Sequence, residues 1–184
     1  MSLEIHAEPL PAGSALRSLV IDRIPSIVPD GRVVVSELPL PGAPVLALDG
    51  EGVPVVVAFD ADGGKALTEG LSATEKVQEN AAWLVALCPG IPDGCPFDRV
   101  RLMVLSPKPP AGARHLVLGM ANLFIATIRA VRIGRDLGLL VEPWQPEEAP
   151  LEGPSRKACT ERTHIFRTGQ ITLTEEEEAF FKSL

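Results

Sequence analysis

What this 184-residue sequence lacks excludes several classes of protein. It has only three cysteines, an odd and widely spaced set, which does not fit the disulfide framework of a small secreted domain. Its start, "MSLEIHAEPL", has neither the basic residues nor the apolar core of a signal peptide. Its longest apolar stretch, residues 117–128, is too short to span a bilayer. We therefore expect a soluble, cytoplasmic protein with no membrane attachment.

The sequence is also short of positive charge. Lys and Arg number 17 against 24 Asp and Glu, which gives a net charge of −7 and a pI near 5.0. Proteins that bind nucleic acid usually carry a basic surface, because neutralising phosphates supplies much of their affinity. The charge balance therefore argues against nucleic acid as a partner.

Hydrophobic residues are plentiful, at 46% of the chain, enough for one domain with a sizeable core. The apolar patterns and turn residues predict the order α-β-β-β-α-β-α-β, an α/β fold with a mixed sheet flanked by helices. The run "VPVVVAF" is apolar at nearly every position, so this strand should be buried on both faces. The predicted helices cover 13–24 (with Ser14 as its cap), 66–88 and 116–137 (ending at Gly138), and the predicted strands cover 33–38, 45–49, 53–59, 99–106 and 139–143.

This domain is expected to occupy residues 1–143. Residues 144–160 contain three Pro and three Glu and are predicted to be an exposed linker. Residues 161–184 form a C-terminal extension with a short acidic helix that Thr174 caps. Phe180 and Phe181 give that helix an apolar side, which either folds back on its own domain or docks on a partner.

Three segments carry a resemblance to a known family. Residues 37–60 look like a three-stranded meander, residues 76–87 ("KVQENAAWLVAL") look like the helix after it, with Gln78, and residues 126–144 look like a late helix and strand. This order resembles the PD-(D/E)xK nuclease superfamily, the restriction-endonuclease-like fold, and its RecB-like and NucS-like branch in particular. The resemblance implies a metal-dependent nuclease site with an Asp on the second meander strand and Glu-x-Lys on the third.

The predicted hairpin locates that site in this chain. If the strands at 45–49 and 53–59 turn near Glu51, Ala58 lies opposite Pro44, and Ala58 and Asp60 share a face. The family's Glu then falls at Ala58, its Lys at Asp60, and its Asp at or beside Pro44 or Val45. An alanine holds no Mg²⁺, and an aspartate in place of the lysine reverses a charge. We therefore expect a non-catalytic domain with no cofactor and a structural or interaction role. Its partner is unknown, and the resemblance allows a homodimer.

Three alternatives stay open at this point. A divergent nuclease site could use Glu37, Asp60 and Asp62, with Gln78 nearby and Mg²⁺ or Mn²⁺ as its metal, although Asp60 and Asp62 also suit a simple turn at a strand end. The protein could instead bind a small molecule around the proline-rich loop at 106–115. Four side chains could hold zinc, at spacings looser than usual for structural sites: Cys88, Cys95, Cys159 and His164.

Overall fold

The computed structural model describes residues 5–134 and 136–145. Within these ranges the chain forms a mixed sheet of seven strands and four α-helices. The strands are β1 (Ile5–Glu8), β2 (Arg32–Val35), β3 (Val45–Leu48), β4 (Pro54–Phe59), β5 (Arg101–Ser106), β6 (Leu123–Ile133) and β7 (Asp136–Pro143). The helices are α1 (Gly13–Ile27), α2 (Gly63–Glu79), α3 (Ala81–Leu87) and α4 (Ala113–Gly119), with a 3-10 turn, η1, at Phe97–Arg99.

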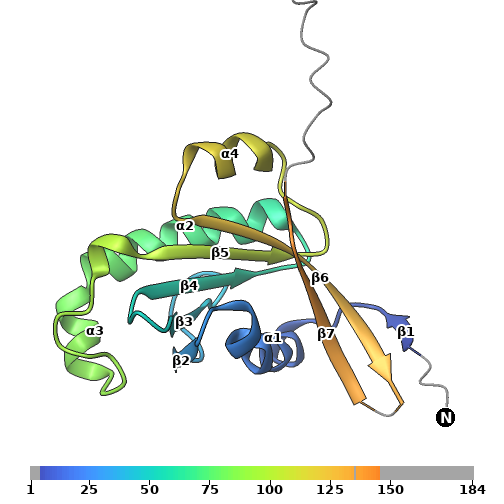
Figure 1. Cartoon of the computed structure of the whole chain (residues 1–184), viewed down its shortest axis with the longest axis horizontal. Coiled ribbons are helices and arrows are strands. Elements are labelled where there is room, and N and C mark those ends of the chain that lie inside the picture. Colours follow the sequence, from blue (N-terminus) through green and yellow to red (C-terminus); the bar gives the residue numbers. More distant parts are fainter. Residues whose placement is uncertain (1–4, 135, 146–184) are drawn as a thin grey trace, which may run out of the picture. The chain divides into compact units, whose positions relative to one another are not determined.

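The strands follow the order β1-β6-β5-β4-β3-β2, and β7 pairs with the other side of β6 (Figure 1). β2, β3 and β4 form an antiparallel meander. β4, β5 and β6 are parallel, so their carboxyl ends point the same way. β7 returns antiparallel beside β6 and forms a hairpin with it. The predicted order of helix, meander, helix and parallel strand is therefore present over the first part of the chain.

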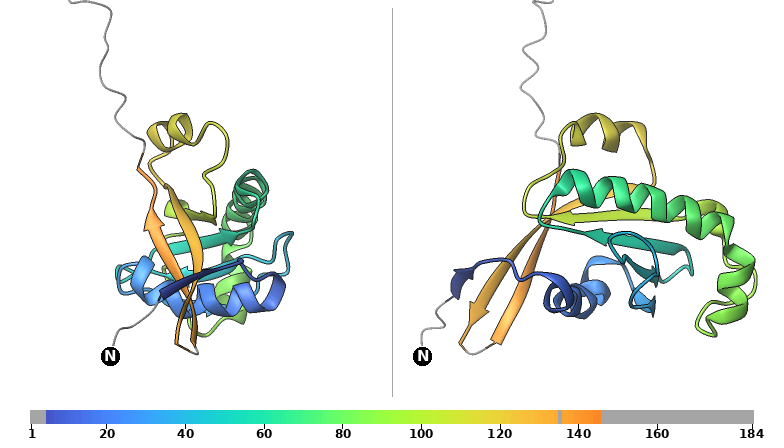
Figure 2. Two further views of the ribbon diagram at one scale, coloured as in Figure 1. Left: turned by 90° about the vertical axis from the view of Figure 1, so that its right-hand side faces the viewer. Right: turned by 180° about the vertical axis from the view of Figure 1, so that it is seen from behind.

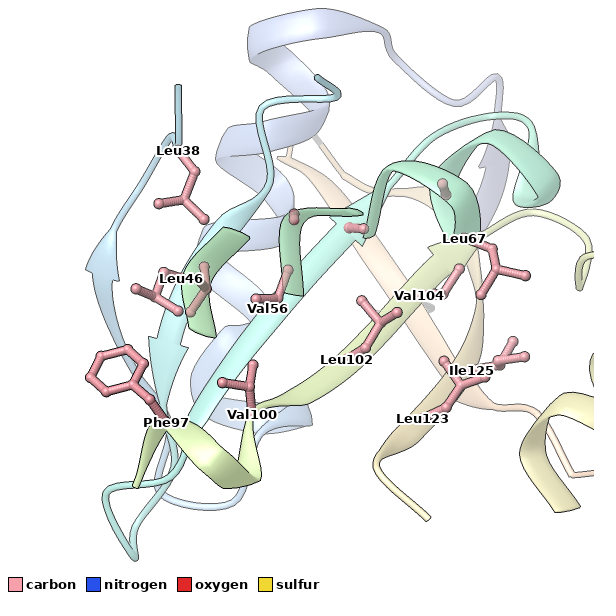
Figure 3. Close-up of a cluster of buried hydrophobic side chains, with 14 of the residues drawn as sticks. Leu38, Leu46, Val56, Leu67, Phe97, Val100, Leu102, Val104, Leu123 and Ile125 are labelled. Carbon is pink, nitrogen blue, oxygen red and sulfur yellow. The ribbon is translucent and has the colours of Figure 1, made fainter. Parts of the chain in front are cut away.

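Helices cover both faces of this sheet (Figure 2). α1 lies on one face, where Leu16, Val20 and Ile24 pack on alternate residues of β3 and β4. α2 lies on the other face, and its apolar side packs on Val56 and Leu102 among others (Figure 3). All six residues of β4 are buried, which confirms the prediction from its continuous apolar run. No helix in the described ranges is long and apolar enough to cross a membrane.

The predicted helix over 116–137 is wrong. α4 ends at Gly119, and the segment continues as β6 and β7 with a turn at Gly134, whose φ is +65°. Gly138, the predicted helix end, lies inside β7 opposite Val131. The reason is the density of β-branched residues in β6, which lose side-chain freedom in a helix and pack well in a strand. They are Ile125, Thr127, Ile128, Val131 and Ile133.

Several smaller features also differ from the expectation. The helix predicted at 66–88 is two helices, which divide at Asn80. Ser14 does not cap α1, because the helix already begins at Gly13 and Ala12 occupies the cap position. The strand β1 was not predicted. It is only four residues long, and it pairs with β6, which lies more than a hundred residues further along the chain. The predicted linker beyond residue 145 and the C-terminal extension lie outside the described residues.

Candidate functional site

The carboxyl end of β4 brings two carboxylates to the start of α2. The backbone N–H of Asp60 donates to the carbonyl oxygen of Leu105, which ties the strand end to β5. The carboxylate of Asp60 accepts from the N–H of Asp62 at 2.9 Å and from Nζ of Lys65 at 2.9 Å. Partial burial acts to raise the pKa of Asp60, but these hydrogen bonds and the Lys65 charge outweigh it and lower the pKa. Asp60 is therefore an ionised, paired side chain.

Asp62 has a different task, because it caps α2. Its Oδ1 accepts from the N–H groups of Gly64 at 2.8 Å and Lys65 at 3.3 Å. This is the usual way in which an Asp stabilises a helix start, by satisfying N–H groups that have no partner within the helix. Both acidic residues of the "DADGG" stretch therefore hold the turn in place, as the simpler interpretation of the sequence has it.

The loop after β5 approaches the first residue of α2, Gly63, very closely. A side chain at Gly63 would come within 2.6 Å of the Lys108 carbonyl oxygen and 2.8 Å of Ser106 Oγ. Ser106 is fully buried, and its hydroxyl donates to that same carbonyl at 2.6 Å. The beginning of the 106–115 loop, where a ligand pocket was one alternative, thus packs closely on the start of α2.

A crevice of about 440 Å³ opens beside Asp60. α1 contributes Arg17 to it, and the guanidinium of Arg17 donates to Glu37 at 2.7 Å and to the Ala43 carbonyl oxygen at 3.4 Å. The crevice therefore contains two cations, and each is paired with a carboxylate. The other residues around it are mainly apolar or small: Leu10, Pro11, Ala12, Gly13, Leu16, Leu40, Gly42, Ala43, Phe59 and Ala61.

The hairpin register agrees with the prediction. Val45 pairs with Val57, so continuing the ladder by one residue sets Pro44 opposite Ala58. Ala58, however, does not reach the crevice. It is only 3% exposed, and a Cβ on Gly70 of α2 would lie 2.9 Å from the Ala58 Cβ and 2.7 Å from Leu102 Cδ1.

Helix α2 therefore closes over position 58. Pro44 is buried too, and its carbonyl oxygen accepts from the N–H of Leu38. Of the three positions where the resemblance places active-site groups, only Asp60 lines the crevice.

The alternative metal site is not assembled either. Glu37 is exposed and is engaged by Arg17, while Asp62 caps α2. Gln78 is exposed and lies sixteen residues beyond Asp62, about 24 Å along the helix at 1.5 Å per residue, so it is far from Asp60. Over residues 5–134 and 136–145, no three His, Cys, Asp or Glu side chains come together as a metal site.

Two of the four zinc candidates lie in the described chain. Cys88 and Cys95 are half-buried and pack against the cluster beneath α2. The thiol of Cys95 donates to the carbonyl oxygen of Gly52 at 3.4 Å, and burial raises its pKa, which disfavours the thiolate that binds metal. Cys159 and His164 lie outside the described residues.

Two charged residues have roles that the sequence did not reveal. Arg17 links α1 to the segment between β2 and β3, but it follows no motif. Asp49, which directly follows β3, is 6% exposed. Its carboxylate accepts from the N–H groups of Glu51 and Val53 and pairs with Arg101. An Asp just before the turn "GEG" was the available signal for such a contact.

Comparisons of this chain with protein-family models, with curated proteins and with solved structures found no match.

Proposed function

We propose that this chain is a non-catalytic domain of restriction-endonuclease-like type, with a structural or interaction role. The order of elements supports the proposal, since α1 precedes a β2-β3-β4 meander and α2 leads to a parallel β5. Of the three segments that carry the resemblance, residues 37–60 contain β3 and β4 and residues 76–87 contain the end of α2 and α3. The third, residues 126–144, lies in the β6–β7 hairpin and lacks the late helix that the resemblance implies. Function must be argued from the site, however, and not from the fold.

One observation at the site carries the proposal. Position 58, where the resemblance expects a glutamate, holds an alanine that is 3% exposed and so close to α2 that a Cβ on Gly70 would lie 2.9 Å from its own Cβ. A metal-dependent hydrolase needs carboxylates that converge on an open cavity. Position 58 carries no carboxylate, and α2 packs directly over it.

The remaining charges support the same conclusion. Asp60 stands where the resemblance expects a lysine, and its carboxylate is held by Lys65 and the Asp62 N–H. A divergent nuclease using Glu37, Asp60 and Asp62 would have to break all three sets of contacts to free those carboxylates for Mg²⁺. The net charge of −7 also opposes binding to a phosphate backbone.

The proposal predicts that the purified protein does not cleave DNA. Single-stranded, duplex and flapped substrates should remain intact with Mg²⁺ or Mn²⁺, at the level of a reaction without protein. The matched control is Asp60→Ala, prepared in the same way, which reveals any contaminating nuclease because a contaminant is unaffected by the substitution. Metal-dependent cleavage by the unmodified protein that Asp60→Ala abolishes would contradict the proposal.

A further inference from the structure

Among the described residues, β7 is an edge strand of the sheet. It pairs with β6 along its whole length, and no other strand of the described chain pairs with it. Alternate residues of such a strand direct free N–H and C=O groups outward, ready to pair with another chain. Edge strands of natural proteins often carry charged side chains that prevent pairing with another chain. Between Asp136 and Glu142, however, β7 has only the uncharged sequence "LGLLV".

Apolar side chains surround this edge. Leu140 of β7 is 44% exposed and Ile133 of β6 is 39% exposed. A cavity of about 400 Å³ lies along the strand between these residues and Ile27 of α1. A second cavity, of about 380 Å³, adjoins the first, since Ile27 and Val141 line both. The free backbone groups and the apolar surface thus coincide.

We infer that a second copy of this chain covers the edge, with the two β7 strands paired antiparallel about a two-fold axis. An antiparallel pair of identical strands is self-complementary, as a closed dimer requires. If Leu140 sits opposite the partner's Leu140, these exposed side chains cover each other. Leu139 of each chain then lies opposite Val141 of the other, on the α1 face of the sheet. The two sheets become one continuous sheet.

Charge complementarity supports this register. It sets the partner's Glu142 directly opposite Gly138. Nη2 of Arg23, an exposed residue of α1, lies 3.4 Å from the point where a Cβ of Gly138 would be. Arg23 is therefore at the right place to bind the partner's Glu142, and the two-fold axis creates this ion pair twice. In the part of the chain that the structure describes, the Glu142 carboxylate makes one ion pair, a long contact of 3.8 Å with Arg129.

Sedimentation of the full chain over a range of concentrations tests the inference. We expect a reversible monomer–dimer equilibrium, and Leu140→Lys should raise its dissociation constant about tenfold or more, because two like charges then face each other at the axis. Arg99→Glu, in η1 before β5, is the control for a change of surface charge and should leave the equilibrium unchanged. Circular dichroism verifies that each variant is folded.

A charge exchange provides the sharper test. Arg23→Glu and Glu142→Arg should each weaken the homodimer, since each sets like charges across the axis. Mixing the two variants should restore dimers, because in the mixed pair both contacts join opposite charges. A wild-type chain that stays monomeric at every concentration, or a dimer unaffected by Leu140→Lys and by either charge reversal, would overturn the inference. The nuclease assay does not depend on this outcome, so the two proposals fail separately.

Discussion

Introducing a glutamate at position 58 should strongly destabilise the protein and should not create an active site. Ala58→Glu places a carboxylate beneath Gly70 of α2. The contact is already so close that a Cβ on Gly70 would lie only 2.9 Å from the Ala58 Cβ. Burying an unpaired charge and overpacking a close contact both destabilise, and together we expect a loss of about 4 kcal/mol or more in the free energy of unfolding. Urea denaturation followed by circular dichroism measures this loss.

Ala61→Glu is the matched control for that experiment. It adds the same side chain three residues further on, at an exposed position in the turn before α2. We expect its free energy of unfolding to lie within about 0.5 kcal/mol of the wild-type value, as for most surface changes. Equal stabilities for Ala58→Glu and Ala61→Glu would mean that α2 yields readily, and that position 58 is open to the crevice after all.

The second large effect is expected at Asp49. Asp49→Ala removes the acceptor for the N–H groups of Glu51 and Val53 and leaves Arg101 without its buried partner. Each unsatisfied buried group costs about 1–3 kcal/mol, so we expect a total loss of about 3 kcal/mol in the free energy of unfolding. The β3–β4 turn would lose its anchor, and the change should appear as a lower urea midpoint.

Two variants separate the parts of this effect. Glu51→Ala removes the other, exposed carboxylate near Arg101, at 3.8 Å, and should cost less than about 0.5 kcal/mol. Asp49→Asn keeps an oxygen acceptor for the turn but loses the charge, so its loss should lie between those of the other two variants. If Asp49→Ala were as mild as Glu51→Ala, the carboxylate would not be what holds the hairpin.

The hairpin shows what could be predicted from the sequence. The apolar run of β4 and the "GEG" turn fix a local pairing, and both are short-range features. The β6–β7 hairpin was missed because apolar residues such as Phe124, Ile128 and Val131 are also spaced four and three residues apart, as on one side of a helix. Spacing alone does not separate a helix from two paired strands. The β-branched residues and Gly134 were the better guide there.

The site depended on contacts between distant parts of the chain. Alternation along β4 predicted that Ala58 and Asp60 share a face, but β4 ends at Phe59, and only Asp60 lines the crevice. Nothing local shows that Gly70 lies on Ala58. The same holds for Arg17 with Glu37 and for Asp49 with Arg101, since each pair joins residues twenty or more positions apart. Such partners are set by how helices pack on the sheet and by how the strands are ordered within it.

Mn²⁺ binding is the measurement that tests the absence of a metal site most directly. Paramagnetic Mn²⁺ broadens the amide NMR signals of nearby residues, so a titration of the ¹⁵N-labelled chain reports any ion held near Asp60. We predict only weak, non-saturating broadening at exposed acidic residues, with no preference for Asp60, Ala61 and Asp62. Saturable broadening of those three amides at stoichiometric Mn²⁺, lost in Asp60→Asn, would contradict the account.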